Sequence, residues 1–457
     1  MRRVRIVLWG FGAMGSGVAR MLLNKKGVEI TGVVDGWDKL WGVSIFERLQ
    51  LKQEDYPEQP DVLIVENPAE VVSRENCDLV VLATDSFTAK AYSKICFCLE
   101  RGVNVITTAE EMAWPWAQEP ELSAEMDRLA RQNKVSVLGT GVNPGFILDL
   151  LVLVLTGACE GVDWIKAARI NDLSPFGKAV MEEQGVGIEV DEFNRLVAED
   201  KMTGHVGFPE SVGLIAAGLG VEIVDLKETR DAIVSTVERK ADHFHVLPGK
   251  VAGVRQQVFA SSKDTKDFIH LDHPQQVYPE LEGTETGDYI NIRSGEVEMK
   301  MRIKPETPGG IGTIAMCVNM IPLVINAEPG LLSLLDLPIP RAILGDMRLL
   351  MNANKEPRRL YKAGDMVTIE YVSIPAGERA PSVPEDTAAC PLKVWLKGNL
   401  PEDAYTGDEV SIRTVIGREV KGRLTNLPVS YSHDYGEYVP ELDCIRHQVK
   451  NILWEEA

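Results

Sequence analysis

The chain has 457 residues, of which 45% are hydrophobic and 25% charged, so we expect a globular protein of two or three domains. Its formal net charge of −20 argues against nucleic acid, and against an anionic membrane surface, as the main partner. The seven cysteines form no Cys-x-x-Cys pair, which is typical of a protein kept in a reducing cytoplasm. No charged-then-apolar leader precedes the first predicted strand, and no apolar stretch is long enough to span a bilayer. We therefore expect a cytoplasmic protein without membrane contact.

The first predicted element is a glycine-rich turn between a strand and a helix. An apolar run over residues 4–9 leads into the sequence Gly10, Phe11, Gly12, Ala13, Met14, Gly15. Gly10 allows the tight turn, Gly12 lets the backbone approach a pyrophosphate, and Gly15 lets the helix pack against the strand. A second apolar run ends in Asp35, whose carboxylate can accept hydrogen bonds from a ribose diol. This order of elements predicts a dinucleotide site that favours NAD, although Lys39 nearby leaves NADP open.

The alternation of strand-like and helix-like segments continues to about residue 145. Apolar runs at 61–65, 79–83, 103–107 and 135–138 predict parallel strands, with helices over 88–102 and 119–133. We predict an α/β Rossmann domain over residues 1–145.

Ligands of such sheets bind beyond the carboxyl ends of the strands. Polar residues follow three of these ends: 83–86, 107–110 and 139–145. We expect Ala83, Thr84 and Thr107 to flank the ribose and nicotinamide of the cofactor. Asn143 would lie near the reacting carbon, in contact with both cofactor and substrate. The alternative for each is ordinary loop chemistry.

The remaining chain divides into two further predicted domains. Residues 146–309 predict an α+β substrate and oligomerisation domain with an open mixed or antiparallel sheet, from alternating runs at 223–238, 250–260 and 289–303. A helix over 313–325 should return to the first domain, with residues 310–350 packing on it and 331–340 closing against it. Residues 351–358 predict a linker. Residues 359–457 predict a small, mostly-β domain with short strands near 366–373, 393–396, 409–415 and 420–427.

A polar segment, 169–178, follows a strand-like run in the second domain. Arg169 could clamp a substrate carboxylate through two parallel hydrogen bonds. Asp172 or Lys178 could take up or give a proton, and Ser174 is a further substrate-binding candidate. The same charged groups could instead form a surface ion pair.

Histidines occur in a second candidate segment and in two pairs. His205 and Glu210 bracket a turn and are further candidates for proton transfer. The pairs at 243 and 245 and at 270 and 273 lack additional ligands nearby, so we expect no metal site.

The glycine turn, the 139–146 turn, R-I-N-D-L-S-P-F-G-K from Arg169 and G-H-V-G-F-P-E-S from Gly204 resemble 2,4-diaminopentanoate dehydrogenases, distant relatives of dihydrodipicolinate reductases. The resemblance covers about residues 1–350. It implies the NAD(P)-dependent oxidative deamination of 2,4-diaminopentanoate to 2-amino-4-oxopentanoate and ammonia in ornithine degradation. It leaves Asp172, Lys178, His205 and Glu210 as alternative bases, with Arg169 or the Asn143 region holding the carboxylate. The paired histidines before a lysine found in dihydrodipicolinate reductases are absent.

Residues 358–457 are similar to the alpha subunit of 2-amino-4-ketopentanoate thiolase, through motifs at 377–381, 384–387, 395–398, 414–418 and 431–436. That enzyme consumes the dehydrogenase product, cleaving it with CoA to alanine and acetyl-CoA. The resemblance implies a fusion of consecutive steps, with pyridoxal phosphate on a separate beta subunit. Arg379, Asp386, His433 and Asp434 could reach into the partner's site, or could merely stabilise loops. We also expect a homo-oligomer, dimer or tetramer.

Two alternatives remain at this stage. One is a dihydrodipicolinate reductase-like or homoserine dehydrogenase-like enzyme with a C-terminal accessory domain. A regulatory domain that senses amino acids would need two amphipathic helices over a four-stranded sheet, and residues 358–457 show strands without clear helices. The other is a non-catalytic scaffold that binds NAD.

Overall fold

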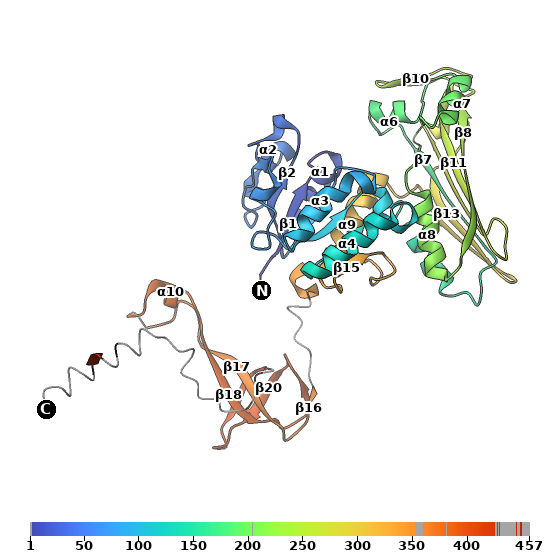
Figure 1. Ribbon diagram of the computed structural model, residues 1–457. Helices are drawn as coiled ribbons and strands as arrows, with labels where there is room; N and C mark the ends of the chain where they lie inside the picture. Colours follow the sequence, from blue (N-terminus) through green and yellow to red (C-terminus); the bar gives the residue numbers. More distant parts are fainter. Residues whose placement is uncertain are drawn as a thin grey trace, which may run out of the picture. The chain divides into compact units, whose positions relative to one another are not determined.

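The computed structural model describes residues 2–202, 204–351, 360–380 and 382–425, together with residues 427, 429, 445, 448 and 449. The chain forms two compact units, Met1–Asn354 and Lys355–Ala457 (Figure 1). Among the described residues, no helix is both long and apolar enough to cross a membrane.

A seven-stranded parallel sheet forms the first layer of the first unit. Its strand order is β15-β6-β5-β4-β1-β2-β3. The strands are β1 (Val4–Trp9), β2 (Val28–Val34), β3 (Ile64–Val65), β4 (Leu79–Leu82), β5 (Asn104–Thr107), β6 (Ser136–Gly139) and β15 (Gly330–Leu332). The predicted doubly wound sheet is confirmed, and the start of the predicted closing segment is its outermost strand.

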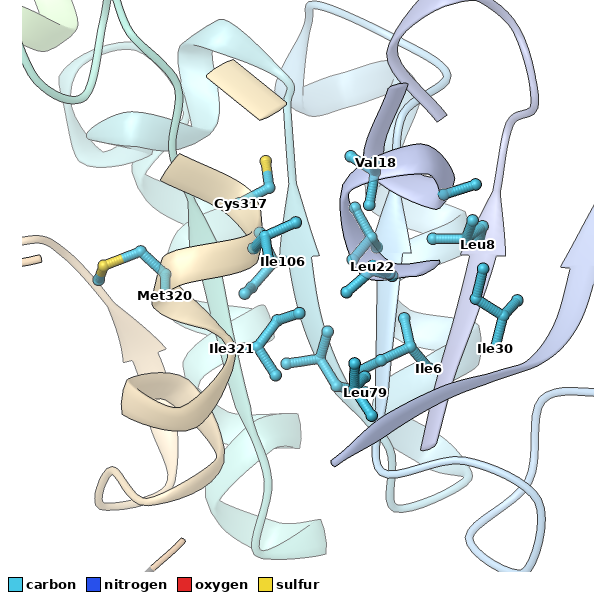
Figure 2. Close-up of a cluster of buried hydrophobic side chains, with 14 of the residues drawn as sticks. Ile6, Leu8, Val18, Leu22, Ile30, Leu79, Ile106, Cys317, Met320 and Ile321 are labelled. Atoms are coloured by element: carbon cyan, nitrogen blue, oxygen red, sulfur yellow. The ribbon is translucent and has the colours of Figure 1, made fainter. Parts of the chain in front are cut away.

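Helices cover both faces of this sheet because its strands are apolar on both sides. They are α1 (Ala13–Leu23), α2 (Ile45–Leu49), α3 (Thr88–Glu100), α4 (Pro120–Asn133) and α9 (Gly309–Ile325). Ile6 and Leu8 of β1 face a core shared with α1 and α9, whereas Val7 between them faces the core shared with α3 and α4. Figure 2 shows the first of these cores, in which Ile321 of α9 lies near side chains of α1 and the strands. The returning helix therefore completes one face of the sheet.

A six-stranded sheet of order β14-β13-β7-β12-β11-β8 forms the second layer (Figure 1). Its strands are β7 (Trp164–Asp172), β8 (Ile223–Val234), β11 (Val251–Ser262), β12 (Ile269–Gln276), β13 (Gly287–Ser294) and β14 (Val297–Ile303). Only β7 and β12 run parallel, so the sheet is mixed. Its apolar face packs against α5 (Leu150–Thr156) and α8 (Phe208–Leu219). Smaller elements flank it: α6 (Lys178–Glu183), α7 (Val190–Ala198), β9 (Arg239–Ala241) and β10 (Phe244–Val246).

The predicted run over 289–303 is two strands rather than one. Gly295, at a φ of 57°, lies in the turn between β13 and β14, and Asp288 of β13 pairs with Ile303 of β14. The alternating pattern continues through the turn, so only the glycine indicates where the chain reverses.

The described part of the second unit contains a small closed barrel of strands β17, β18, β20 and β21. Their bounds, with those of the accompanying elements, are β16 (Leu360–Tyr361), β17 (Met366–Ile374), α10 (Glu385–Ala388), β18 (Leu392–Asn399), β19 (Ala404–Tyr405), β20 (Glu409–Arg413) and β21 (Glu419–Leu424). Val367, Ile369, Ile412 and Leu424 are almost fully buried inside it. The prediction of a small, mostly-β domain is confirmed for this part of the chain.

Candidate active site

The glycine turn between β1 and α1 has the geometry of a phosphate-binding loop. Gly10 has a φ of 95°, and a Cβ at this position would lie 2.5 Å from the Ala83 carbonyl oxygen. A Cβ on Gly15 would lie 1.8 Å from the Gly10 carbonyl oxygen. By contrast, a Cβ on Gly12 would meet nothing within 4 Å. Two of the glycines thus allow close packing, and Gly12 leaves the space that a pyrophosphate requires.

Asp35 also holds this loop in place. Its Oδ2 accepts a hydrogen bond from the Phe11 N–H at 2.6 Å, and its Oδ1 accepts one from the Trp37 N–H at 2.8 Å. A carboxylate has about four lone-pair positions, so capacity remains for a ribose diol. Gly12 is the N-cap of α1 and has no side-chain cap, so the first-turn N–H groups of this helix are available to a ligand.

A cavity of about 400 Å³ extends from this loop to the second sheet; we call it the inner cavity. It lies between the carboxyl ends of the first sheet and the polar end of β7. Its lining residues are Met14, Ala83, Thr84, Asp85, Ser86, Thr108, Glu110, Gly141, Val142, Asn143, Pro144, Arg169, Asn171, Phe176, His205, His273, Gly309, Gly310 and Thr313.

Asn143 and two histidines meet at one wall of the inner cavity. Asn143 Nδ2 lies 3.0 Å from His205 Nε2, and the rings of His205 and His273 are 4.8 Å apart. His273 Nδ1 donates to the Arg169 carbonyl oxygen at 2.6 Å. Burial, and secondarily the charge of Arg169, lower the pKa of His205 to about 3. His205 is therefore neutral near pH 7 and suited to orienting Asn143 rather than to taking up a proton.

Arg169 lines the inner cavity but is already engaged by the protein. Its Nη1 donates to Asp288 at 2.7 Å and its Nη2 to the Thr307 carbonyl oxygen at 2.5 Å, and only 1% of the residue is exposed. Each of these nitrogens carries a second N–H group, so the two-bond clamp on a substrate carboxylate stays a prediction. The burial of Arg169 is explained by its ion pair with Asp288.

Two carboxylates line the inner cavity, and they differ in their partners. Asp85 forms an ion pair with Lys94 at 2.5 Å. Glu110 has no cation partner among the described residues; burial raises its pKa, while hydrogen bonds with its own backbone and with Ser86 partly offset this. A carboxylate of this kind is suited to taking up a proton from a bound amine. Glu110 was not among the predicted bases, although it lies in the polar segment predicted at the end of β5.

The other predicted bases do not line the inner cavity, although Asp172 lines a larger cavity beside it. Asp172 accepts hydrogen bonds from the Ser174 and Tyr278 N–H groups. Lys178 is exposed and lies 3.5 Å from Glu182, so it forms a surface ion pair with a residue outside the predicted polar segment. Glu210 is buried with one oxygen 2.6 Å from Gln118 Nε2, and burial raises its pKa to about 7.

The remaining predicted residues fall in three places. Ser174 accepts a hydrogen bond from the Tyr278 N–H, and Thr107 accepts one from the Ala109 N–H, so each supports a turn. Arg379 is half-buried in the loop after β17, and Asp386 lies in α10. His433 and Asp434 lie outside the described residues. In the part of the chain that the structure describes, no three His, Cys, Asp or Glu side chains are arranged to hold a metal ion.

Comparisons with known proteins match the two units separately. Residues 146–353 match the family model of the 2,4-diaminopentanoate dehydrogenase C-terminal domain, and residues 360–453 match that of AKP thiolase subunit OrtA. The 2,4-diaminopentanoate dehydrogenase of Acetoanaerobium sticklandii is 51% identical over 353 residues, which is 77% of this chain and 98% of that protein. The 2-amino-4-ketopentanoate thiolase alpha subunit of the same organism is 47% identical over 93 residues, 20% of this chain and 92% of that subunit.

A solved structure supports the fold of the first unit. The amine dehydrogenase from Mycobacterium smegmatis superimposes with a TM-score of 0.65 at 26% identity, over 75% of this chain and 98% of that one. The chain therefore belongs to the 2,4-diaminopentanoate dehydrogenase family and carries, in its second unit, a domain of the 2-amino-4-ketopentanoate thiolase alpha-subunit family.

Proposed function

We propose that the first unit catalyses the NAD(P)-dependent oxidative deamination of 2,4-diaminopentanoate to 2-amino-4-oxopentanoate and ammonia. The observation that carries this proposal is the inner cavity, which extends from Met14, in the first turn of α1 after Gly12, to the carboxylate of Glu110. The substrate and the pathway are those in the names of the relatives at 51% and 47% identity.

The residues present fit a bound dinucleotide. Gly12 and the first turn of α1 would hold its pyrophosphate, and Asp35 its adenosine ribose. Met14, Thr84 and Asn143 line the inner cavity where the nicotinamide ring would lie. When bound, this group supplies an acceptor for the hydride that leaves C4 of the substrate. Asp35 would repel a 2′-phosphate, which favours NAD.

Glu110 takes up a proton from the C4 ammonium, so that the neutral amine can support loss of hydride from its carbon. Once Glu110 has released this proton to solvent, its carboxylate can take up a second proton from the water that adds to the resulting iminium. Asn143, whose Nδ2 lies against His205, offers its unpartnered Oδ1 as a hydrogen-bond acceptor within the site. The balanced reaction converts the diamine, NAD⁺ and water to the ketone, NADH and ammonium, with release of one proton.

Incubation of the full chain with NAD and 2,4-diaminopentanoate tests this function. We expect reduced nicotinamide, ammonia and 2-amino-4-oxopentanoate in equal amounts, and NADP in a parallel reaction reports cofactor preference. Cofactor binding without turnover would instead favour the non-catalytic scaffold. Oxidation of homoserine with NAD, or reduction of a dihydrodipicolinate with NADH, in place of oxidation of the diamine would favour the other alternative.

For the second unit, we propose association with a pyridoxal phosphate-dependent thiolase beta subunit. The support is the family match over residues 360–453 and the name of the relative, an alpha subunit. Mixing the full chain with such a beta subunit should give a stable complex that forms acetyl-CoA from 2-amino-4-oxopentanoate and CoA. The beta subunit alone is the control. Absence of both a complex and any change in thiolase activity would contradict the proposal.

A further inference from the structure

A second cavity adjoins the inner one and is larger. It has a volume of about 920 Å³, and we call it the outer cavity. Four residues line both cavities: Asn171, Phe176, Gly309 and Gly310. A single ligand can therefore occupy both, with its reacting carbon in the inner cavity and a polar end in the outer one. The contacts described above do not identify the chemical group that this polar end carries.

The amino end of α9 forms part of the boundary between the cavities. Pro308 is its N-cap and provides no side-chain cap, and the first helical hydrogen bond runs from the Gly312 N–H to the Pro308 carbonyl oxygen. The N–H groups of Gly309, Gly310 and Ile311 thus have no acceptor among the described residues, and all three residues line the outer cavity. Such groups, with the positive end of the helix dipole, favour an anion.

Arg169 adds positive charge at the same place. A Cβ on Gly309 would lie 3.9 Å from Arg169 Nη2, so the guanidinium faces the first turn of α9. Its nitrogens already donate to Asp288 and to the Thr307 carbonyl oxygen. Arg169 does not line the outer cavity, so it acts on an anion bound there through its field, while the backbone supplies the hydrogen bonds.

A second and independent observation points to a ligand that donates hydrogen bonds. Asn171 is only 7% exposed, it lines both cavities, and its Oδ1 has no hydrogen-bond partner. A buried, unpaired amide oxygen costs free energy unless a ligand completes it.

Glu306 stands beside Asn171 on the wall of the outer cavity. Its one described hydrogen bond is a long one, 3.5 Å from the Asp172 N–H. The lysine on this wall, Lys304, is ion-paired with Glu285, and Arg169, whose charge attracts Glu306, forms its ion pair with Asp288. Glu306 and the Asn171 amide therefore offer acceptors for a cation next to the anion position at α9.

We propose that the outer cavity binds the α-amino-acid end of the substrate, with its carboxylate on the N–H groups at the amino end of α9 and its C2 ammonium on Glu306 and Asn171. This inference rests on the function proposed above. It explains why an anion position and a cation position lie side by side, because a zwitterionic head group carries both charges on neighbouring carbons. The C4 amine then extends toward Glu110 in the inner cavity.

Three substrates separate the two halves of the proposed subsite. 2,4-Diaminopentanoate carries both charged groups, 4-aminopentanoate lacks the C2 ammonium, and pentane-2,4-diamine lacks the carboxylate. Gly309→Pro removes one N–H at the first helical position, where proline is well accepted. Pro308 has a ψ of 122°, as a residue before proline requires. Gly309→Ala retains the N–H and is the steric reference, and Glu306→Gln removes only the charge.

Loss of one charge-assisted hydrogen bond should raise KM about tenfold. Relative to Gly309→Ala, Gly309→Pro should raise KM for 2,4-diaminopentanoate and 4-aminopentanoate, which carry the carboxylate, and not for pentane-2,4-diamine. Glu306→Gln should raise KM for 2,4-diaminopentanoate and pentane-2,4-diamine, which carry the C2 ammonium, and not for 4-aminopentanoate. The exposed Glu296, in the turn after β13, provides a charge control through Glu296→Gln, which should leave all three KM values unchanged.

Equal effects of either variant on all three substrates would overturn the subsite. Circular dichroism and thermal unfolding identify a Gly309→Pro variant that fails to fold, and the Glu306→Gln comparison decides the question in that case. Wild-type protein that oxidises none of the three amines would instead refute the proposed function itself. The two failures are therefore distinguishable.

Discussion

Replacing Glu110 with glutamine should lower kcat by about 10²–10⁴-fold, the usual contribution of a positioned general base. The variant keeps the size of the side chain and its hydrogen-bonding capacity toward Ser86, and removes only the ability to take up a proton. KM should change little, because the proposed binding contacts of the substrate lie in the outer cavity. Steady-state formation of reduced nicotinamide, with saturating cofactor, measures both constants.

The pH profile gives an independent reading of the same residue. Burial raises the pKa of Glu110, and a base is active only when deprotonated. Activity of the wild type should therefore fall as the pH drops through a value above the ordinary range of glutamate. In Glu110→Gln this limb should be absent.

Glu111 provides a matched control at the neighbouring position. Its Oε2 accepts a hydrogen bond from the Thr88 N–H at 2.7 Å, and the residue does not line the inner cavity. Glu111→Gln makes the same change of charge and retains an acceptor for Thr88. We expect it to retain most of the activity and to keep the acid limb at a lower pH than in the wild type, because the charge of Glu111 contributes to the raised pKa of Glu110. A Glu110→Gln enzyme as active as this control would assign the base elsewhere.

The first sheet could be predicted because its signals are local. The glycine turn, the apolar runs and Asp35 lie within about 35 residues, and each of these signals depends on neighbours in the sequence. The hairpin at Gly295 was missed because a strand pattern with period two does not show where a chain reverses. The parallel pairing of β7 with β12 joins segments about 100 residues apart, and no local pattern encodes it.

The contacts of the candidate site depend on folding of the whole first unit. Asn143 and His205 are 62 residues apart, and His273 lies on another strand, so their convergence follows from sheet topology alone. The ion pair of Arg169 was not predicted, because its partner Asp288 is 119 residues away in the sequence. Glu110 was predicted only as one of the polar residues at the end of a strand and not as a base. Its burial and its lack of a described cation partner are properties of the folded cavity.

Replacing Gly12 with alanine should separate cofactor binding from folding. A Cβ at this position meets no protein atom within 4 Å, and its φ of −73° lies outside the left-handed region. The melting temperature should therefore shift by no more than about 2 °C. The added methyl group would occupy the space through which a pyrophosphate approaches the backbone. We expect the Kd for NAD to rise about 10–100-fold, which corresponds to ~1.4–2.7 kcal/mol.

Two further glycine substitutions make the Gly12 result decisive. Gly161→Ala adds the same methyl group at an open position between α5 and β7, far from the loop, and should change neither Kd nor melting temperature. Gly15→Ala places a Cβ 1.8 Å from the Gly10 carbonyl oxygen and should destabilise the fold as well as weaken binding. Titration calorimetry and thermal unfolding measure the two properties independently. If Gly12→Ala bound NAD and NADP as tightly as Gly161→Ala, the pyrophosphate would not lie over this loop. A pyrophosphate bound there would contact the added methyl group, which has no protein atom within 4 Å.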